Sequence, residues 1–552
     1  MSRKRLGDLL IEFGLITDDQ LEQALAEQKV TKQPLGEILT QRGLLAEEQL
    51  IEVIEFQLGI PHMNLDRFEI ERPVIELVPE EFARSYNVLP VKRDKNRLTL
   101  AMVDPFDYFA IDDIQMTTGL QIHPVIATRD SIHRAFERYY SLKRSISEVL
   151  MDRQPVEIVE EHVRAEDAPI VRLVNQLIEQ AVDKRASDIH FDSQQTGVVV
   201  RFRIDGILMN QLSLPKHLQP VVTARIKIMA NLNIAERRLP QDGRIQMQVR
   251  GRPIDVRVAT LPTIFGEKVV LRLLDMKNAI TEVEKLGFSE VNKKAFLQMI
   301  SAAHGIVLVT GPTGSGKTST LYAALHHLNT EQQNLITIED PVEYQLDGIN
   351  QVQVNPAAGL TFATGLRSIL REDPNIIMVG EIRDKETAEI AFRAALTGHL
   401  VLSTLHTNDA PSVVARLMDM GLEPYLIAST IRGVVAQRLV RQICTECRKA
   451  YRPLPDETAV LDRHGFFADQ LWRGQGCSAC NRTGYRGRLA IHEVVPFEEP
   501  VRTLVSQQQA GKAYREWAKQ HGYKNMLEDG LEKAAQGLTT LEEVFQVVIR
   551  EM

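Results

Sequence analysis

The sequence predicts a multidomain α/β protein, and three observations lead to this prediction. The chain has 552 residues, enough for three or four domains if each takes ~150 residues. Its content of 44% hydrophobic and 25% charged residues is ordinary for a globular protein. A helical repeat at the N-terminus is followed by stretches in which short β runs alternate with helical runs.

Changes in pattern divide the chain into five segments. Helical spacing of leucine and isoleucine covers residues 1–64. A small α/β domain is predicted over 65–145, with the β runs VLPVKR, RLTLAMV and IHPVIAT. Residues 146–167 are charged and lack glycine, and we interpret them as a linker. A second α/β domain is predicted over 168–280, and a third over 281–552, which ends in helices.

Charge and hydropathy narrow the class of protein. The formal net charge of −8 argues against non-specific nucleic-acid binding as the main role. No run approaches the ~20 apolar residues of a membrane span, and MSRKRLGDLL lacks the apolar core of a secretory signal. We therefore expect a cytoplasmic protein that reaches the inner face of the plasma membrane only through partners.

The segment GIVLVTGPTGSGKTSTLYAALHHL contains a complete Gly-x-x-x-x-Gly-Lys-Thr motif between an apolar run and a helical run. Its glycines allow backbone N–H groups to point at phosphates, and the following helix adds its positive end. Lys317 is expected to reach the β- and γ-phosphates, and Thr318 to ligate Mg²⁺. A chance glycine-rich turn would lack both flanking elements. The predicted nucleotide-binding residues are Gly311, Pro312, Thr313, Gly314, Ser315, Gly316, Lys317 and Thr318.

Three later apolar runs end in residues suited to phosphoryl transfer. NLITIEDPVEYQ brings Glu339 and Glu343, and NIIMVGEIRDKETAE brings Glu381. An acid at the end of a neighbouring strand can hold a metal ion and the attacking water. The run TGHLVLSTLHTND is flanked by His399 and His406. A lone histidine is usually a surface or core residue. For two histidines that flank one apolar strand beside a nucleotide site, a functional role and a structural role are about equally favoured.

These motifs, together with RASDIHFD, RFRIDG and RLPQDGR upstream, resemble the secretion ATPase superfamily of type II secretion and type IV pilus assembly. The resemblance covers about residues 168–488 and implies a PAS-like second α/β domain and a RecA-like ATPase domain. It implies that Glu381 is the catalytic glutamate, that the other two glutamates help hold Mg²⁺ and water, and that both histidines sense the γ-phosphate. It also implies that arginines reach the nucleotide or a subunit boundary, although each is also compatible with a surface ion pair: Arg257, Arg272, Arg367 and Arg371.

The resemblance further implies an ATP- and Mg²⁺-dependent homohexamer that drives an inner-membrane platform protein. We therefore expect a motor for assembling type IV pili or a related filament. A type II secretion motor shares every ATPase motif, whereas retraction motors lack such a long N-terminal region. A non-hydrolysing regulatory component is the alternative from another class. A nucleic-acid motor is disfavoured by the acidity of the chain and by the absence of a basic, aromatic-rich stretch.

All four cysteines fall in two Cys-x-x-Cys pairs, within a predicted insertion at 441–488. Two such pairs suit a tetrahedral Zn²⁺ ion, and a site closed by four protein ligands is structural, not catalytic. Disulfides are disfavoured in a reducing cytoplasm, and a redox motif does not explain two pairs. The predicted zinc ligands are Cys444, Cys447, Cys477 and Cys480.

The N-terminal segment repeats itself: RLGDLLIEFGLITDDQLEQALAEQ is followed by PLGEILTQRGLLAEEQLIEVIEFQ at a 29-residue period. The pattern predicts two helical hairpins, with Thr17 as a helix N-cap and with Gly14 and Gly43 ending the first helix of each. It does not explain Gly7 and Gly36, which lie at the start of a helical run. Glycine there suggests that another group approaches the backbone closely.

The repeat looks like the N-terminal cyclic di-GMP-binding domain of the mannose-sensitive haemagglutinin pilus ATPase type. The chief departure is Pro34 at the position of Arg5, so the second half-site must lack that cation or use another, such as Arg42. A purely structural repeat that docks to a partner is the alternative. By resemblance the ligand contacts are Arg5, Leu6, Gly7, Leu10, Gly14, Leu21, Leu25, Gln28, Leu35, Gly36, Leu39, Gly43, Leu50, Ile54 and Gln57.

Overall fold

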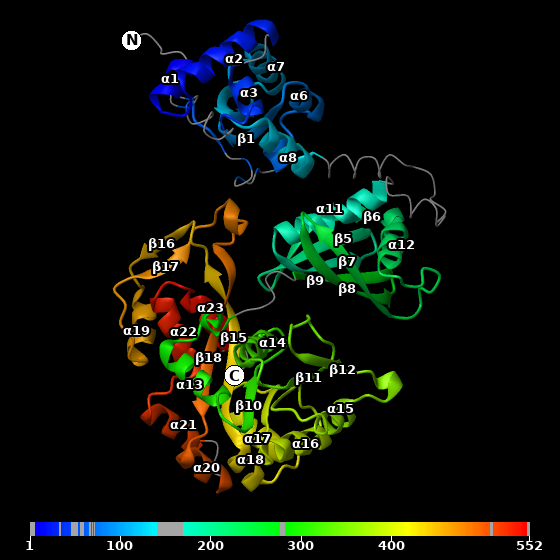
Figure 1. The fold of residues 1–552 in the computed structure, drawn as a ribbon, viewed down its shortest axis with the longest axis vertical. Coiled ribbons are helices and arrows are strands. Elements are labelled where there is room, and N and C mark those ends of the chain that lie inside the picture. Colours follow the sequence, from blue (N-terminus) through cyan, green and yellow to red (C-terminus); the bar gives the residue numbers. More distant parts are fainter. Residues whose placement is uncertain are drawn as a thin grey trace. The chain divides into compact units, whose positions relative to one another are not determined.

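The computed structural model describes residues 6–31, 35–45, 53, 55, 60–63, 65, 68, 70, 72–140, 169–275, 282–507 and 512–548. The chain forms two compact units, and the boundary between them falls within helix α11 (Pro169–Asp183). Residues 220–225 of α12 (Gln219–Met229) group with the first unit. Figure 1 shows the elements of both units along the chain.

The two repeated segments fold alike where both are described. The first forms α1 (Leu6–Glu12) and α2 (Asp18–Thr31), and the second begins with α3 (Leu35–Gln41). Gly14 and Gly43 have φ values of 70° and 68° and end α1 and α3 in the same way. In both turns a leucine N–H donates back to a leucine carbonyl, at 2.9 Å after Gly14 and at 3.0 Å after Gly43. The predicted hairpin turns are therefore confirmed.

A three-stranded sheet follows the repeat, in the order β1-β2-β3. Strands β1 and β2 are antiparallel, while β2 and β3 are parallel and are joined through α7. All three predicted β runs are therefore confirmed as strands. The elements of this part are α5 (Arg72–Ile75), α6 (Glu80–Ser85), β1 (Val88–Asp94), β2 (Arg97–Met102), α7 (Tyr108–Thr118), β3 (Gln121–Ile126) and α8 (Arg129–Tyr139).

The second α/β segment forms an antiparallel sheet of six strands in the order β6-β5-β4-β9-β8-β7. One face of this sheet carries Asp188 and Asp192 of β4, which point to the same side because they lie an even number of residues apart. Both acids pair with basic side chains of the neighbouring strands. A short 3₁₀ turn, η1 (Lys216–Leu218), leads into α12. The strands are β4 (Ala186–Ser193), β5 (Gly197–Ile204), β6 (Ile207–Pro215), β7 (Gln241–Val249), β8 (Arg252–Thr263) and β9 (Gly266–Asp275).

The largest segment is built on a seven-stranded sheet in the order β12-β11-β13-β14-β10-β15-β18. Its first six strands are parallel and β18 is antiparallel to β15. The strands are β10 (Gly305–Thr310), β11 (Leu335–Glu339), β12 (Asn350–Gln353), β13 (Ile376–Val379), β14 (Leu400–Leu405), β15 (Ile431–Ile443) and β18 (Tyr485–Pro496). Both faces are covered by helices, so β10, β11, β13 and β14 are fully buried, as expected for a parallel sheet.

Two apolar cores flank this sheet. Residues of β10 that point to one side pack with helices α13 (Glu290–Ile300) and α14 (Lys317–Leu328). Those that point to the other side pack with α15 (Phe362–Ile369), α16 (Lys385–Leu396), α17 (Pro411–Asp419), α18 (Pro424–Thr430) and α20 (Glu499–Ser506). The predicted helical end is confirmed by α20, α21 (Lys512–Gln520), α22 (Met526–Ala535) and α23 (Leu541–Val548).

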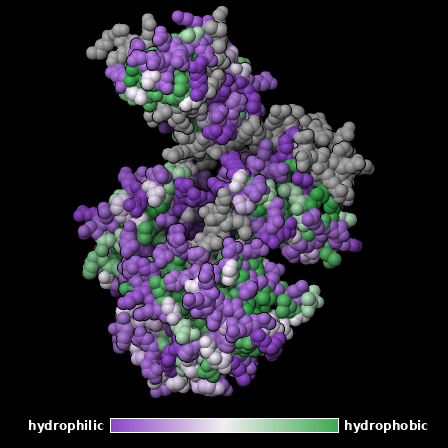
Figure 2. Space-filling model, viewed as in Figure 1, coloured by the Kyte–Doolittle hydropathy of each residue, from purple (hydrophilic) through white to green (hydrophobic). Residues whose placement is uncertain are grey.

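The remaining elements of this segment are short. They are η3 (Val283–Leu286), η4 (Pro356–Ala358), β16 (Arg448–Tyr451), α19 (Pro455–Arg463), β17 (Leu471–Gly474) and η5 (Ser478–Cys480). None of the helices among the described residues is long and apolar enough to cross a membrane. The face of the molecule drawn in Figure 2 is mostly hydrophilic, with smaller apolar patches between.

Candidate functional site

The phosphate-binding loop joins the central strand β10 to helix α14. Its backbone conformation needs glycine: Gly311 and Gly316 have φ values of 150° and 87°. A Cβ on Gly311 would lie 2.5 Å from the carbonyl oxygen of Gln437, so the loop fits closely against strand β15. Lys317 is buried and its Nζ donates to the carbonyl oxygens of Gly311 at 2.7 Å and Pro312 at 3.0 Å. Thr318 is exposed, so its hydroxyl is accessible to a metal ion.

The environment of Lys317 is less favourable to its charge than water is. Burial lowers the pKa of Lys317 to about 8, and the positive charge of Arg438 acts in the same direction, whereas Glu381 opposes the shift. Phosphates bound at the loop would bring negative charge to this ammonium group. The lysine is therefore held by backbone carbonyls in a position suited to a polyphosphate.

The strand order brings the predicted acids and one histidine to the same edge. The phosphate-binding loop follows β10, His406 follows β14, Glu381 follows β13, and Glu339 ends β11. Because these neighbouring strands are parallel, their carboxyl ends meet at one edge, where open α/β sheets bind ligands. The four sequence segments thus line a single edge of the sheet.

Glu381 is held on both carboxylate oxygens. Its Oε1 lies 2.7 Å from Arg383 Nη2, and its Oε2 lies 3.4 Å from His406 Nε2. The carboxylate also contributes to the electrostatic environment of Lys317. A glutamate that is oriented by neighbours, beside a phosphate-binding lysine, can position and deprotonate a water molecule.

The carboxylate of Glu339 is enclosed by the protein, whereas a metal ligand at an open sheet edge would be accessible. Its carboxylate is buried, accepts a hydrogen bond from the hydroxyl of Tyr322, and receives Thr337 Oγ1 at 2.7 Å and Gln351 Nε2 at 3.1 Å. Burial and the nearby Glu339 charge raise the pKa of Tyr322. Both oxygens are therefore engaged within the protein, and Glu339 fixes the end of β11.

Glu343 pairs with one of the predicted arginines. Arg257 Nη1 lies 2.8 Å from Glu343 Oε2, and Arg257 Nη2 donates to the carbonyl oxygen of Val342 at 2.6 Å. Arg272 instead lies 3.2 Å from Asp188, through its Nε, and its side chain is 60% exposed. The structure thus brings Arg257 to the acidic segment after β11, while Arg272 stays on the charged face of its own sheet.

The two histidines lie at opposite ends of β14. Strands β10 and β14 are parallel and in register, with Gly305 beside Leu400 and Thr310 beside Leu405. His406 therefore lies at the same edge as the phosphate-binding loop. His399 precedes the strand, and its Nδ1 lies 3.0 Å from the carbonyl oxygen of Ala394. The structure does not bring His399 to the phosphate edge of its own chain, since a six-residue strand separates the two ends by ~20 Å.

Arg367 and Arg371 lie on and just after α15. Arg367 pairs with Glu386 at 2.5 Å, and Arg371 Nη1 donates to the carbonyl oxygen of Arg367 at 2.8 Å. In this chain the two arginines make helix–helix and helix-end contacts on the surface.

Two polar residues of this site were missed from the sequence, although their pattern offered a signal. Gln437 and Arg438 interrupt the apolar run IRGVVAQRLV of strand β15, and both are buried. Gln437 Nε2 donates to the carbonyl oxygen of Ser315 at 2.7 Å, inside the phosphate-binding loop. A buried polar residue in a central strand usually has a specific partner, so this pair could have been singled out.

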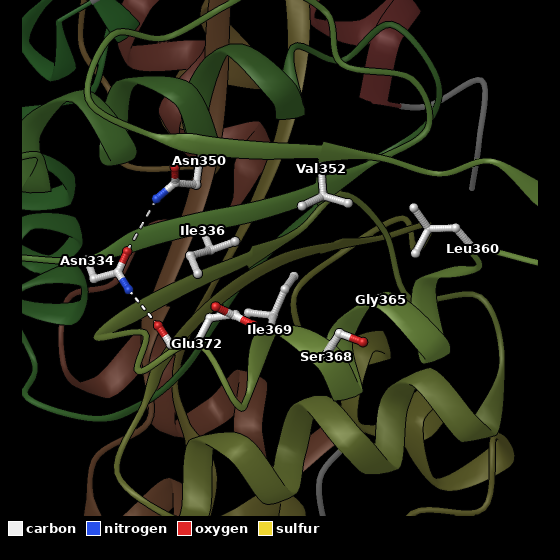
Figure 3. Close-up of a pocket in the computed structure, with 9 residues that line it drawn as sticks. All are labelled: Asn334, Ile336, Asn350, Val352, Leu360, Gly365, Ser368, Ile369 and Glu372. Atoms are coloured by element: carbon white, nitrogen blue, oxygen red, sulfur yellow. Dashed lines mark hydrogen bonds between the residues drawn. The ribbon is translucent and has the colours of Figure 1, made fainter.

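A cavity of about 350 Å³ lies elsewhere on the same sheet, between β11, β12 and α15. Figure 3 shows Asn334 at one end, with hydrogen bonds to Asn350 at 3.5 Å and to the carbonyl oxygen of Glu372 at 2.8 Å. Asn334 precedes β11, so this end of the cavity is opposite to the edge that carries the phosphate-binding loop. The cavity is therefore separate from the nucleotide site.

The four cysteines come together as predicted. Their Sγ atoms all lie within 4.8 Å of one another, with separations of 3.8 Å for Cys444–Cys477, 3.8 Å for Cys447–Cys480 and 3.7 Å for Cys477–Cys480. Four sulfurs around a tetrahedral ion at ~2.3 Å lie ~3.8 Å apart, so the cluster has the dimensions of a zinc site. Burial raises the pKa of the Cys480 thiol, but hydrogen bonds from the backbone N–H groups of Cys477 and Gly484, together with those from the Cys477 and Cys447 side chains, lower that pKa to about 7.

In the repeat, the structure supplies a reason for one of the unexplained glycines. A Cβ on Gly7 would lie 2.7 Å from Leu21 Cδ1, so the close approach comes from helix α2. Leu25, also on α2, is 39% exposed. Arg42 pairs with Glu27 at 2.5 Å, beside the predicted contact Gln28. Four predicted contacts lie outside the described residues: Arg5, Leu50, Ile54 and Gln57.

A phosphate-binding loop after a central parallel strand, with a glutamate and a histidine on the adjacent strand ends, defines a P-loop ATPase. The chain belongs to the type II/IV secretion ATPase family, since the profile described as "Type II/IV secretion system protein" matches residues 163–546. A second profile, described as "MshEN domain", matches residues 58–146.

Relatives cover nearly the whole chain. The chain is 45% identical over 557 residues to "Type IV pilus assembly ATPase PilB" of Myxococcus xanthus, with 98% of each chain covered. It is 45% identical over 505 residues to "Type II secretion system protein E" of Xanthomonas campestris pv. campestris, covering 89% of this chain and 88% of the relative. The solved structure of the Legionella pneumophila ATPase DotB matches with a TM-score of 0.53 and 24% identity, over 69% of this chain and 95% of that one. This last likeness supports the fold alone.

Proposed function

We propose that this ATPase is the motor that powers assembly of a type IV pilus or a related filament, and that it acts as a homohexamer on an inner-membrane platform protein. The observation that carries the proposal is the match to a pilus assembly ATPase along 98% of both chains, which includes the N-terminal segment. ATP hydrolysis would supply the energy of the motor, and Glu381, oriented by Arg383 and close enough to influence the charge of Lys317, would catalyse that step.

Different residues of the chain would bind the phosphates, hold Mg²⁺ and activate the attacking water. Lys317 and the backbone N–H groups of the loop bind the phosphates, and the Thr318 hydroxyl would hold Mg²⁺, which neutralises phosphate charge when bound. Glu381 orients the attacking water and accepts its proton, while Arg383 and His406 hold the Glu381 carboxylate in place. By resemblance, Arg257 and Arg272 add positive charge toward the phosphates when the second α/β domain closes.

The catalytic part of the proposal is tested with Glu381→Gln. The amide keeps the size of the side chain but cannot accept a proton, so we expect ATP to bind with near-normal affinity while the turnover rate falls by about 10³-fold. Glu386→Gln is the matched control, since Glu386 lies on the surface of α16 and pairs with Arg367. Normal turnover by Glu381→Gln would remove Glu381 from the mechanism.

The cellular part is tested by deleting the gene and restoring it with the wild-type or Glu381→Gln chain. Pilus assembly predicts that surface filaments disappear and return only with the wild-type chain. Loss of secreted proteins with filaments intact would instead support the type II secretion motor, a role that is compatible with the match to a type II secretion protein E. Full restoration by the Glu381→Gln chain would favour a regulatory component that does not hydrolyse ATP.

We further propose that the N-terminal repeat binds cyclic di-GMP. Two features support this proposal: the MshEN profile matches residues 58–146, which directly follow the repeat, and Leu25 is exposed on α2 outside the apolar core of the repeat. Paired leucines on two similar surfaces suit the two guanine bases of a two-fold ligand. An exposed leucine such as Leu25 would cover a base face, whereas Leu10 and Leu39 lie in the apolar core of the repeat and would support that surface from beneath. The glycine turns would allow the backbone to approach the ligand.

Calorimetric titration of the full-length chain tests the ligand, with GTP as the control nucleotide. Leu25→Ser should weaken cyclic di-GMP binding about tenfold or more, because it removes apolar contact from an exposed position. Phe13→Ser is the control, since Phe13 is also an exposed apolar side chain of the repeat but is not a predicted contact. Gly7→Arg is a poor probe because it would displace Leu21. No binding by the wild-type chain would leave the repeat as a docking module.

A further inference from the structure

Strand β15 carries two adjacent polar residues in an otherwise apolar, buried environment. Gln437 is 1% exposed and Arg438 is 4% exposed, and the strand lies directly beside β10. Burial of an amide or a guanidinium group is unfavourable unless its hydrogen bonds are satisfied. The partners of these two side chains therefore indicate what the residues do.

Gln437 uses both ends of its side-chain amide at the phosphate-binding loop. Its Nε2 donates to the carbonyl oxygen of Ser315 at 2.7 Å, and its Oε1 accepts from Thr320 Oγ1 at 2.7 Å. Ser315 lies within the loop, and Thr320 lies in the first turn of α14. Gln437 thus connects the loop to the beginning of the helix whose N–H groups face the phosphates.

Arg438 reaches the segment that follows β14, which we define as the His406 loop (residues 406–410). Its Nη2 donates to the carbonyl oxygen of Asn408 at 3.0 Å, and its Nη1 donates to the carbonyl oxygen of Gln437 at 3.1 Å. The same loop is joined to β10 by the hydroxyl pair Thr310–Thr407, at 2.8 Å. Arg438 therefore fixes the backbone two residues beyond His406.

We propose that Gln437 and Arg438 are positioning residues for ATP hydrolysis, which hold the phosphate-binding loop and the His406 loop in register from a single strand. Successive side chains of a strand point to opposite sides, so two neighbouring residues can support two different loops. Gln437 sets the shape of the loop that binds the phosphates. Arg438 sets the position of His406, which in turn lies 3.4 Å from Glu381.

The proposal predicts a separation of kinetic effects between the two residues. Gln437→Met removes the support of the phosphate-binding loop, so the Kd for ATP should rise about tenfold in the full-length protein. Arg438→Lys keeps the charge but cannot span the same acceptors, so kcat should fall about tenfold or more while the Kd for ATP changes less than about threefold. Gln442→Met is the control: it makes the same substitution farther along β15, and its Kd and kcat should match the wild type.

Thermal unfolding of each variant separates positioning from folding. If Gln437→Met does not fold, Thr320→Val tests the same support by removing the hydroxyl that binds Gln437, and Thr320→Ser should restore it. We expect Thr320→Val to raise the Kd for ATP about threefold and Thr320→Ser to leave it unchanged. Wild-type kinetics for Thr320→Val or Gln437→Met would overturn the role of Gln437. Equal losses of affinity and kcat in Arg438→Lys would overturn the role of Arg438.

Discussion

Lys317 illustrates how one residue is prepared for its ligand. The protein buries its ammonium group against backbone carbonyls, and this burial lowers its pKa to about 8. Charge on the lysine is thus disfavoured before the phosphates arrive. Because the folded-state pKa lies below the ordinary value of 10.5, the unfolded chain binds more protons between these two values, and stability rises with pH across that window.

Proton uptake on ATP binding tests the lowered pKa of Lys317. Near pH 8 the lysine of the free protein is about half protonated, so ATP binding should take up about half a proton as the phosphates stabilise the charged form. The uptake is measured by calorimetry in buffers with different ionisation enthalpies. In Lys317→Arg the side chain stays charged throughout, so this part of the uptake should disappear. An unchanged uptake in that variant would assign the proton to another group.

A second prediction for single residues concerns the two histidines at the ends of β14. His406 lies 3.4 Å from Glu381, whereas His399 lies at the other end of the strand. We expect His406→Ala to lower kcat by about 10²-fold, since it removes a group that holds the catalytic carboxylate. His399→Ala should retain kcat within about threefold. If His399→Ala lost as much kcat as His406→Ala, His399 would have to act at the nucleotide site of a neighbouring subunit.

Among the elements, the insertion that carries the cysteines is held by a small apolar cluster, in which Leu461 and Leu471 pack against α22 and α23, and by the sulfur cluster. It contains two short strands, β16 and β17, which form a two-stranded sheet. Such a small sheet is only marginally stable by itself. The sulfur cluster joins the end of β15 to the segment before β18, so a bound zinc ion would close the insertion on the main sheet.

This element therefore predicts a stability effect without a catalytic one. The purified protein should contain about one zinc ion per chain, and Cys480→Ser should reduce the content and lower the Tm by several degrees. Well below the Tm, kcat should stay within about threefold of the wild type, because the cluster offers no open position for substrate. Ser478→Ala, in the same short 3₁₀ turn, is the control. Wild-type stability of a zinc-free Cys480→Ser chain would remove the structural role.

On the scale of the whole molecule, the proposed homohexamer gives the exposed arginines a place to act. Arg272 is largely exposed within its own chain and, among the described residues, pairs with Asp188. A charge of this kind can complete the nucleotide site when the second α/β domain closes in the ring. The ring is thus the state in which the full set of phosphate contacts is expected.

Light scattering tests the assembly. We expect Glu381→Gln with ATP and Mg²⁺ to form a particle of six 62.3 kDa chains, because bound nucleotide that is not hydrolysed keeps the ring closed. Lys317→Met, which weakens nucleotide binding, should assemble less completely under the same conditions. A monomer for Glu381→Gln at saturating ATP would contradict the proposed hexamer.

The parts of the fold that were predicted correctly depend on residues close together in sequence. The short β runs between helical runs predicted β1, β2 and β3, and the glycines at 14 and 43 predicted the ends of α1 and α3. The sequence also predicted the cysteine cluster, because paired spacings leave few arrangements for four thiolates. The packing reason for Gly7 could not be predicted, since it depends on where Leu21 lies across the hairpin.

By itself the sequence determined the phosphate-binding loop, the cysteine pairs and the repeat, since each is a local pattern whose spacing carries the chemistry. The tertiary structure alone decided which of the other candidates meet. Parallel strand order placed His406 with Glu381 and left His399 at the opposite end, and burial committed Glu339 to hydrogen bonds within the protein. The tertiary structure also showed that Gln437 contacts the phosphate-binding loop and that Arg438 contacts the His406 loop. These outcomes depend on which strands are neighbours, and the contacts that decide this join residues far apart in the chain.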